Sequence, residues 1–270
     1  MDLDHHRGGT GEPLVLIHGI GHTWRGWKPM LPLLEPRFDV LAVDLPGFGH
    51  SPPLPPGTDS TPETLADAVE AAMDDAGFGR ANIAGNSLGG WIALELARRG
   101  RATTVVALSP AGLWHAREKT WARGVLRTMR WMARHLPAPE PVVRSPLGKV
   151  LIAGPVMARP WRIDSDDVSE VLRLFANAPG FDATLEHMLA RQVRGLDRVD
   201  CPVLVLWGSR DTLLIPRQGR RFERLIPNCE LRFLKGLGHS PMSDGPELLA
   251  EAIAEFAARS SRAPRAEAPA

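Results

Sequence analysis

Short apolar runs bounded by turn residues recur along this chain of 270 residues, and segments of helical periodicity lie between them. Strands buried on both faces give nearly continuous apolar runs, and parallel strands need a crossover connection that is usually a helix. The pattern therefore predicts an α/β fold with a mostly parallel sheet flanked by helices. The expected strands are Pro13–His18, Phe38–Asp44, Ala81–Ala84, Thr103–Ser109, Pro202–Trp207 and Glu230–Leu234. The expected helices lie near residues 24–34, 62–76, 88–99, 217–225 and 246–259, and Leu3–Arg7 can supply one short edge strand.

The connection between Ser109 and Pro202 is far longer than the roughly two to six residues usual in such a fold. It contains helix starts at Ser145-Pro146 and at Asp164-Ser165, and it has no alternating strand pattern. We therefore expect an inserted all-helical lid. The predicted parts are a core over 1–110 and 198–259, the lid over 111–197, and a disordered, low-complexity tail over 260–270.

The charge is balanced, with 32 Lys and Arg against 31 Asp and Glu, so no nucleic-acid partner or strong membrane attraction is expected. The substrate is expected to be a small molecule. No apolar run is long enough for a membrane span, and the amino terminus does not resemble a signal peptide. A cytoplasmic protein is the expectation, and the sequence carries no mark of an oligomeric state.

Neither a phosphate-binding loop nor a zinc motif occurs in the sequence, so we expect no cofactor and no metal. Cys201 and Cys229 lack the spacing of a disulfide framework or a zinc site. They are predicted to be buried thiols.

Ser87 stands in the stretch AGNSLGG, directly after one apolar run and directly before a helical segment. Gly85 and Gly89 lie two residues to either side of it. This spacing fits a sharp strand-to-helix turn, because larger side chains would collide where strand and helix cross. Such a turn places the serine at a helix amino terminus, where the Leu88 N–H is free and the helix dipole favours an anion. The motif predicts a nucleophile beside an anion site.

A serine nucleophile needs a base, and the base needs a third group that orients it. Of the nine histidines, His239 lies downstream of the serine in a loop just past a strand, and it is the predicted base. Asp211 follows the carboxyl end of another strand and is the predicted acid. Asp44 is its rival, but it precedes the serine, and its continuation DLPGFGHS suggests a turn anchor.

A second oxyanion donor should come from another loop at the same edge of the sheet. The loop His18–Gly21 (HGIG) follows the first strand, and Gly19 lets the backbone approach a substrate. We therefore expect the N–H groups of Ile20 and Leu88 to form the oxyanion hole.

The motifs HGIG, DLPGFGHS, GNSLGG, WGSRD and GLGHSP occur in this order and resemble those of the α/β-hydrolase family over about residues 12–258. The resemblance implies a mostly parallel sheet, a Ser-Asp-His triad and a helical cap. Carried over by position, Ser87 matches the nucleophile, Asp211 the acid and His239 the base, with Ile20 and Leu88 as oxyanion donors. The chain starts late for this family, so the first strands are expected to be short or missing.

Serine in the elbow argues against the dehalogenase and epoxide-hydrolase branches, which carry aspartate there. Ester hydrolysis through an acyl-enzyme is the expected reaction. Asn86 before the nucleophile resembles the carbon-carbon bond hydrolases of ring-fission products. Those enzymes commonly carry tryptophan after the catalytic histidine, whereas Ser240 follows His239 here. A further alternative is a ligand-binding homologue with little turnover.

The predicted lid is rich in Trp, Met and Phe, which suits an apolar acyl or aromatic substrate or simply the core of the lid itself. The candidate substrate contacts are Gly19, Asn86, Trp114 and Trp161. Residues 121–136 form a basic amphipathic segment that fits a lipid surface, an acidic partner or an ordinary solvated cap helix. Its expected apolar face holds Trp121, Val125, Met129, Met132 and Leu136, and its expected basic face holds Arg123, Arg127, Arg130 and Arg134.

Overall fold

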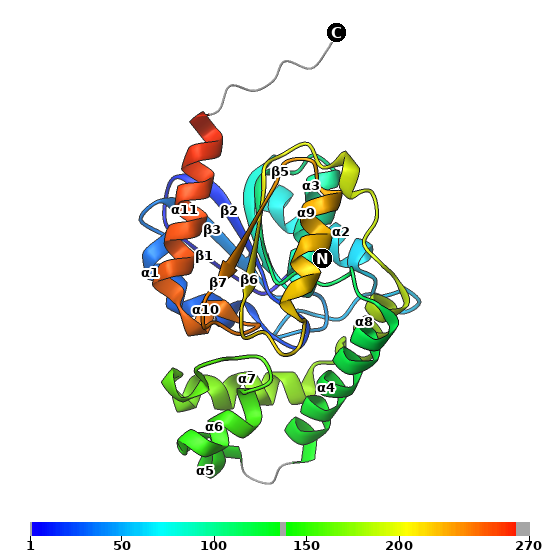
Figure 1. Ribbon diagram of the computed structural model, residues 1–270, viewed down its shortest axis with the longest axis vertical. Coiled ribbons are helices and arrows are strands. Elements are labelled where there is room, and N and C mark those ends of the chain that lie inside the picture. The colour runs from blue at the N-terminus through cyan, green and yellow to red at the C-terminus, as the bar shows by residue number, and fades with distance from the viewer. Residues whose placement is uncertain (1, 136–138, 263–270) are drawn as a thin grey trace.

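The structure is a computed structural model that describes residues 2–135 and 139–262. Its centre is a seven-stranded sheet with the order β1-β3-β2-β4-β5-β6-β7 (Figure 1). All neighbouring strands run parallel except β1, which is antiparallel to β3 at the edge. The strands are β1 His5–Gly8, β2 Glu12–Ile17, β3 Phe38–Val43, β4 Ala81–Asn86, β5 Ala102–Leu108, β6 Val203–Gly208 and β7 Cys229–Leu234. The predicted fold class is confirmed, and β1 is the short edge strand expected from the late start.

The two faces of the sheet are covered by different helices (Figure 1). Alternate residues of one strand point to opposite faces, so that in β2 Val15 and Ile17 belong to one apolar cluster while Leu14 and Leu16 belong to the other. The first face carries α2 Pro62–Asp75, α3 Leu88–Arg98, η4 Pro216–Gln218 and α9 Gly219–Leu225. The second carries the 3-10 helix η1 Trp24–Met30, α1 Leu31–Leu34, α10 Pro241–Asp244 and α11 Pro246–Arg262.

Between β5 and β6 the chain forms the helical insertion, which lies below the sheet in Figure 1. Its α-helices are α4 Ala116–His135, α5 Pro139–Arg144, α6 Pro146–Ala153, α7 Ser165–Asn177 and α8 Phe181–Ala190, with the 3-10 helices η2 Pro160–Arg162 and η3 Leu196–Arg198. Both predicted helix starts are found. The Ser145 hydroxyl accepts the Gly148 N–H at 2.9 Å, and the Asp164 carboxylate accepts the Asp166 N–H at 2.8 Å.

Three sequence-based expectations about burial and helix bounds are wrong. Arg130 is buried and does not share the exposed face of α4, because its guanidinium lies 5.6 and 5.1 Å from the rings of Phe175 and Phe181. Cys229 is only half-buried, because β7 is an edge strand. Residues 260–262 belong to α11 and not to a disordered tail. The rest of that tail and Leu136 lie outside the described residues.

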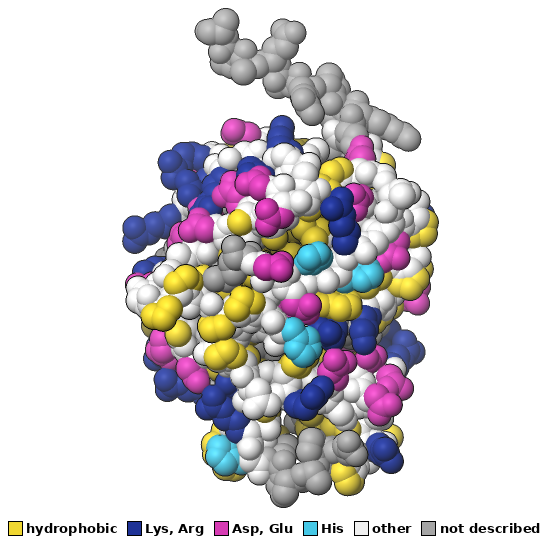
Figure 2. Space-filling view, turned by 180° about the vertical axis from the view of Figure 1, so that it is seen from behind, with side chains coloured by type: hydrophobic (Ala, Val, Ile, Leu, Met, Phe, Trp, Pro, Cys, Tyr) yellow, Lys and Arg dark blue, Asp and Glu magenta, His cyan; other side chains and the backbone are white. Residues whose placement is uncertain are grey.

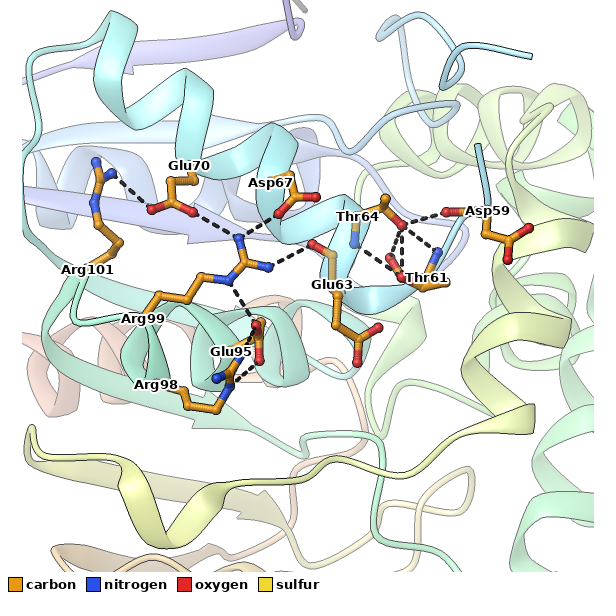
Figure 3. Close-up of polar contacts among 10 residues, drawn as sticks. All are labelled: Asp59, Thr61, Glu63, Thr64, Asp67, Glu70, Glu95, Arg98, Arg99 and Arg101. Carbon is orange, nitrogen blue, oxygen red and sulfur yellow. Dashed lines mark hydrogen bonds and ion pairs between the residues drawn. The ribbon is translucent and has the colours of Figure 1, made fainter. Parts of the chain in front are cut away.

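Helices α2 and α3 are joined by a network of ion pairs (Figure 3). The Arg99 guanidinium donates to Glu95 at 2.8 Å, to Glu70 at 2.9 Å and to Asp67 at 2.6 Å. Burial alone would raise the pKa of Glu95, but hydrogen bonds from Arg98 and Arg99 outweigh burial and lower that pKa. The carboxylate stays charged inside the network and links the two helices.

Within the described residues, no helix is both long enough and apolar enough to cross a bilayer.

Candidate active site

Ser87 lies at the turn between β4 and α3, with a backbone φ of +57° and ψ of −113°. This conformation is rare for a residue that carries a Cβ atom, and such strain persists only where the surrounding structure imposes it. A Cβ atom on Gly85 would lie 2.1 Å from the Gly89 carbonyl oxygen, and one on Gly89 would lie 2.2 Å from the Ile17 carbonyl oxygen. The two glycines therefore let strand and helix cross in backbone contact, and this contact imposes the turn at Ser87.

His239 and Asp211 are joined by a hydrogen bond of 2.7 Å between His239 Nδ1 and Asp211 Oδ2. The other carboxylate oxygen, Asp211 Oδ1, accepts the N–H groups of Leu213 at 3.0 Å and Leu214 at 2.8 Å. Both side chains are buried. Because a carboxylate can only accept, Nδ1 of His239 carries the proton and Nε2 is left free to take another.

Ser87 and His239 line the same cavity, which has a volume of about 140 Å³. The Ser87 hydroxyl forms no hydrogen bond within the described part of the chain. In unliganded enzymes the bond between nucleophile and base is often long, and it tightens when the substrate binds. The structure therefore brings the two side chains to one cavity without joining them.

His18 fixes the loop that follows β2. Its Nε2 accepts the Leu45 N–H at 2.9 Å, so in the neutral ring Nδ1 carries the proton and donates to the Gly19 carbonyl oxygen at 2.7 Å. Burial lowers the pKa of His18 to about 3, so the ring stays neutral. In a trans peptide the N–H points opposite to the C=O. Holding the Gly19 carbonyl therefore turns the Ile20 N–H the other way, and Ile20 lines the cavity.

Gly19 and Leu88 complete the surroundings of Ser87. A Cβ atom on Gly19 would lie 3.2 Å from the Ser87 Cβ atom, so this loop and the elbow are in close contact. Leu88 is the first residue of α3, and the N–H groups of the first helical turn have no partner within the helix. The geometry is compatible with the predicted pair of oxyanion donors, Ile20 and Leu88.

Asn86 connects the elbow to the histidine loop. Its amide nitrogen donates to the His239 carbonyl oxygen at 2.9 Å and to the Leu108 carbonyl oxygen at 3.2 Å. Both amide protons are therefore used within the protein. Asn86 lines the cavity, and its amide nitrogen holds the backbone of His239.

Asp244 connects the histidine loop to the helical insertion, a link that no sequence pattern indicates. Its Oδ2 accepts the N–H groups of Gly238 at 2.7 Å and Ala158 at 2.9 Å, and its Oδ1 accepts the Arg159 N–H at 2.8 Å. The Ser240 N–H also donates to the Val156 carbonyl oxygen at 2.8 Å. The segment that carries His239 is therefore bonded to residues 156–159 of the insertion.

Asp44, the rival acid, stabilises a turn. Its carboxylate accepts the N–H groups of Trp24 at 2.6 Å and His50 at 3.0 Å, and burial raises its pKa to about 6. A Cβ atom on Gly49 would overlap this carboxylate, at 1.7 Å from Oδ2. Asp44 does not contact His239, and this arrangement agrees with the turn anchor inferred from DLPGFGHS.

Trp114 and Trp161 do not line the cavity. Trp114 is buried and packs edge-on against Trp91, with ring centroids 6.3 Å apart, whereas Trp161 is exposed. The apolar walls are formed mainly by the insertion, and Met129, Met157 and Phe175 belong to the Trp, Met and Phe residues that suggested an apolar lining in the sequence. The walls include Leu126, Met129, Ile152, Ala153, Val156, Met157, Ile163, Val168, Val171, Leu172, Phe175 and Leu213. Among the described residues, no group of three or more His, Cys, Asp or Glu side chains is placed to hold a metal ion.

Residues 14–252 match the alpha/beta hydrolase family. The chain is 30% identical over 199 residues to the epoxide hydrolase EphH of Mycobacterium tuberculosis, covering 71% of this chain and 92% of that protein. It is 28% identical over 269 residues to the pimeloyl-(acyl-carrier protein) methyl ester esterase of Photobacterium profundum, covering 92% of this chain and 95% of that protein.

Among solved structures, the chain is similar to a thermophilic esterase from Thermogutta terrifontis, with a TM-score of 0.76 and 25% identity. The similarity covers 96% of this chain and 93% of that one. The protein therefore belongs to the alpha/beta hydrolase family. Its relatives include esterases and an epoxide hydrolase.

Proposed function

We propose that the protein is a serine hydrolase that cleaves a small-molecule carboxylic ester through an acyl-enzyme intermediate. The observation that carries this proposal is the hydrogen bond between His239 and Asp211 beside Ser87 in one cavity. A serine hydroxyl becomes a nucleophile when an oriented imidazole takes its proton. Asp211 supplies that orientation.

The reaction proceeds in two steps. The Ser87 oxygen attacks the ester carbonyl carbon while His239 Nε2 takes its proton, and the resulting oxyanion accepts the N–H groups of Ile20 and Leu88. His239 then gives the proton to the departing alkoxide, which leaves as an alcohol. In the second step His239 activates a water molecule, which attacks the acyl-enzyme and releases the acid.

The relatives point to two chemistries, and Ser87 distinguishes between them. An epoxide opened through an alkyl-enzyme ester needs a carboxylate at the elbow, whereas acyl transfer uses a hydroxyl. The elbow of this chain carries a serine. The relative named as a methyl ester esterase supports the same choice.

The substrate class follows from the cavity walls. Apolar side chains of the helical insertion, including Leu126, Ile152 and Phe175, form most of the lining. The lining includes the charged side chains Arg25 and Asp167, and both are already paired: Arg25 Nε lies 3.1 Å from Glu170, and Asp167 lies 3.1 Å from Lys28 Nζ. An ester with an uncharged, apolar acyl or aromatic group fits such a lining. In this proposal the insertion, residues 111–197, acts as a lid.

A carbon-carbon bond hydrolase is the second candidate, and the contacts of Asn86 argue against it. Its amide protons bind the carbonyl oxygens of Leu108 and His239, so the GNS elbow has a structural explanation. Turnover of p-nitrophenyl esters and of a dienoate ring-fission product should be compared directly. Faster turnover of the dienoate would replace ester hydrolysis by the second candidate.

The proposal is tested by labelling with a fluorophosphonate and by Ser87→Ala. We expect wild-type protein to be labelled and to turn over p-nitrophenyl esters through many cycles. Ser87→Ala should lose labelling and at least about a thousandfold in kcat. Labelling without multiple turnover would indicate a ligand-binding homologue, and full activity of Ser87→Ala would end the proposal.

A further inference from the structure

The basic side chains of α4 are paired within the insertion. Arg123 and Arg127 pair with Glu186 at 3.3 and 2.9 Å, and Arg134 lies 3.5 Å from Asp182. Figure 2 shows Lys or Arg side chains interspersed with Asp or Glu side chains on the lower part of the molecule, which the insertion forms. Of the meanings left open by the sequence, the contacts favour an ordinary solvated cap helix for α4.

His22 lies at the end of the turn that carries the proposed oxyanion donor Ile20. The His22 N–H donates to the Gly19 carbonyl oxygen at 3.1 Å, and Gly21 has a φ of +76°. A positive φ at the third residue of a β-turn favours glycine. Ile20 and His22 both line the cavity. A substrate whose carbonyl oxygen reaches the Ile20 N–H therefore brings its next atoms close to His22.

The hydrogen bonds of Thr23 determine which nitrogen of His22 carries the proton. Thr23 is buried, and its N–H donates to His22 Nδ1 at 2.9 Å and has no other acceptor within the described residues. The Thr23 carbonyl oxygen lies farther from Nδ1, at 3.2 Å, and already accepts the Gly26 N–H at 3.1 Å. A buried N–H needs an acceptor, so Nδ1 accepts and the neutral ring carries its proton on Nε2.

The ring of His22 is neutral and fixed in place. Burial lowers the pKa of His22 below its ordinary value. A Cβ atom on Gly26 would lie 2.4 Å from His22 Cε1, so the ring packs directly on the backbone of η1. Nε2 forms no hydrogen bond within the described part of the chain. An N–H donor without a partner is unfavourable beside apolar walls, and a polar atom of the substrate would satisfy it.

The charges in the lining favour an uncharged ligand group. Arg25 supplies a positive charge, but its Nε lies 3.1 Å from Glu170 and its Nη1 lies 3.6 Å from Asp4. Asp167 also lines the cavity and pairs with Lys28 at 3.1 Å. These carboxylates already pair with the cations and would repel an anionic substituent. An ether or carbonyl oxygen accepts a hydrogen bond without bringing a charge.

We propose that His22 determines substrate specificity by donating from Nε2 to an uncharged oxygen that lies a few bonds from the scissile carbonyl. The oxygen can belong to the acyl part or to the alcohol part of the ester. This inference rests on the proposed function and deepens it. The preferred substrates are apolar esters with one further ether or carbonyl oxygen near the reacting group.

Matched ester pairs test this contact with the full chain. In each pair an ether oxygen replaces one methylene group, so the length of the substrate is kept. The p-nitrophenyl esters of methoxyacetate and 3-methoxypropanoate are compared with those of butanoate and pentanoate, and 2-methoxyethyl butanoate is compared with butyl butanoate. For at least one pair, we expect the ratio of kcat/KM, ether over hydrocarbon, to be roughly five- to tenfold higher in wild type than in His22→Asn. The intrinsic reactivity of the esters cancels because the ratio is compared between two enzymes.

The variants separate the donor from the fold. His22→Asn keeps an oxygen near the position of Nδ1 that can accept the Thr23 N–H, but its side chain does not reach the position of Nε2. His22→Phe keeps a ring, removes both nitrogens and should lose the same preference. Ser243→Ala, which removes a hydroxyl elsewhere in the lining, should keep the preference. Melting curves show whether each variant is folded.

Nitrogen-15 NMR of the imidazole rings provides a readout that needs no turnover. The His22 signals are identified as those lost in His22→Asn, and we expect them to show the proton on Nε2. In Ser87→Ala, the Nε2 signal should shift more when an ether ester is added than when its hydrocarbon partner is added. A failure of the proposed hydrolysis leaves this measurement intact, so the two failures are distinguishable.

Three results would overturn the proposal. One is a kcat/KM ratio that stays unchanged in His22→Asn and His22→Phe for every pair, which would give His22 a purely structural role. The second is a proton on Nδ1 of His22. The third is a Nε2 signal that no ether ester shifts. If wild type cleaves none of the esters, the proposed function fails, and the NMR shift alone decides whether His22 binds the oxygen.

Discussion

The elbow region around α3 and the middle of the helical insertion around α6 differ in how far their apolar side chains are buried. Every residue of α3 from Leu88 to Ala97 is buried, and the glycines beside Ser87 leave no room for a single methyl group. On α6, one face lines the cavity and the other exposes Leu147 and Leu151. The residues of the elbow are fixed by contacts within the protein, whereas the outer residues of α6 are exposed to solvent.

The arginines of the two regions also differ in whether they are ion-paired. Arg98, Arg99 and Arg101 donate to carboxylates of α2 and α3 (Figure 3), so their charges connect two helices. Arg144 and Arg162 have no such partner among the described residues. Charge links two helices in the first region, whereas in the second these two arginines are exposed and unpaired within the described residues.

The largest expected effect is on kcat and comes from a change at Asp211, just after β6. Asp211→Asn should lower kcat by about 10⁴-fold, because an amide can present N–H to His239 Nδ1 and reverse the tautomer of the base. The melting temperature should change far less, since the side chain keeps its shape. Steady-state ester hydrolysis and thermal melting measure the two effects. Near wild-type kcat would remove Asp211 from the mechanism.

Adding one methyl group should have opposite effects on stability in the elbow region and in the insertion. Gly89→Ala should destabilise the protein by roughly 3 kcal/mol or more, because its Cβ atom would lie 2.2 Å from the Ile17 carbonyl oxygen. Gly124→Ala, in α4, has nothing within 4 Å and should stabilise it by about 0.5–1 kcal/mol. Urea unfolding gives both values. Equal effects at the two sites would contradict the comparison.

Loss of His18 should affect the reaction more than the fold. Glutamine has a donor and an acceptor, but its flexible chain does not hold them at the fixed positions of the imidazole nitrogens, so the Ile20 N–H loses its fixed orientation. His18→Gln should lower kcat by roughly 10- to 100-fold, less than the full loss of an oxyanion donor. The KM of the ester should change little, because the oxyanion forms only in the transition state. An effect confined to KM would exclude this role.

An effect that depends on pH is expected between the insertion and the core, where Glu118 of α4 pairs with Arg221 of α9 at 2.6 Å. Burial opposes the charge of Glu118, but hydrogen bonds from Arg221 and the His115 N–H lower its pKa from 4.5 to about 2. A lowered pKa stabilises the fold above pH 4.5, and this stabilisation is lost as the pH falls towards 2.

Glu118→Gln should therefore destabilise the protein by about 1–3 kcal/mol at neutral pH. The difference from wild type should shrink as the pH falls. Melting curves recorded from neutral to acidic pH test this dependence. A constant difference across that range would show that the charge of Glu118 has no role.

The sequence predicts the fold well because its signals are local. Apolar runs place every strand to within two residues, and Ser87 and His239 share a cavity because both follow the carboxyl ends of parallel strands. The sequence does not predict the burial of Trp114 and Arg130 or the exposure of Trp161, because these depend on partners far along the chain. Arg130 has the spacing of a surface residue, yet rings from α7 and α8 cover it.

The insertion is attached to the core near its start and in its middle. Glu118 binds α9 near its start, and Asp244 binds residues 158 and 159 just after α6. An insertion bonded to the core at two such points cannot rotate away from the cavity about a single hinge. Helices α5 and α6 lie between these two attachments, so any widening of the cavity there moves the segment that exposes Leu147 and Leu151.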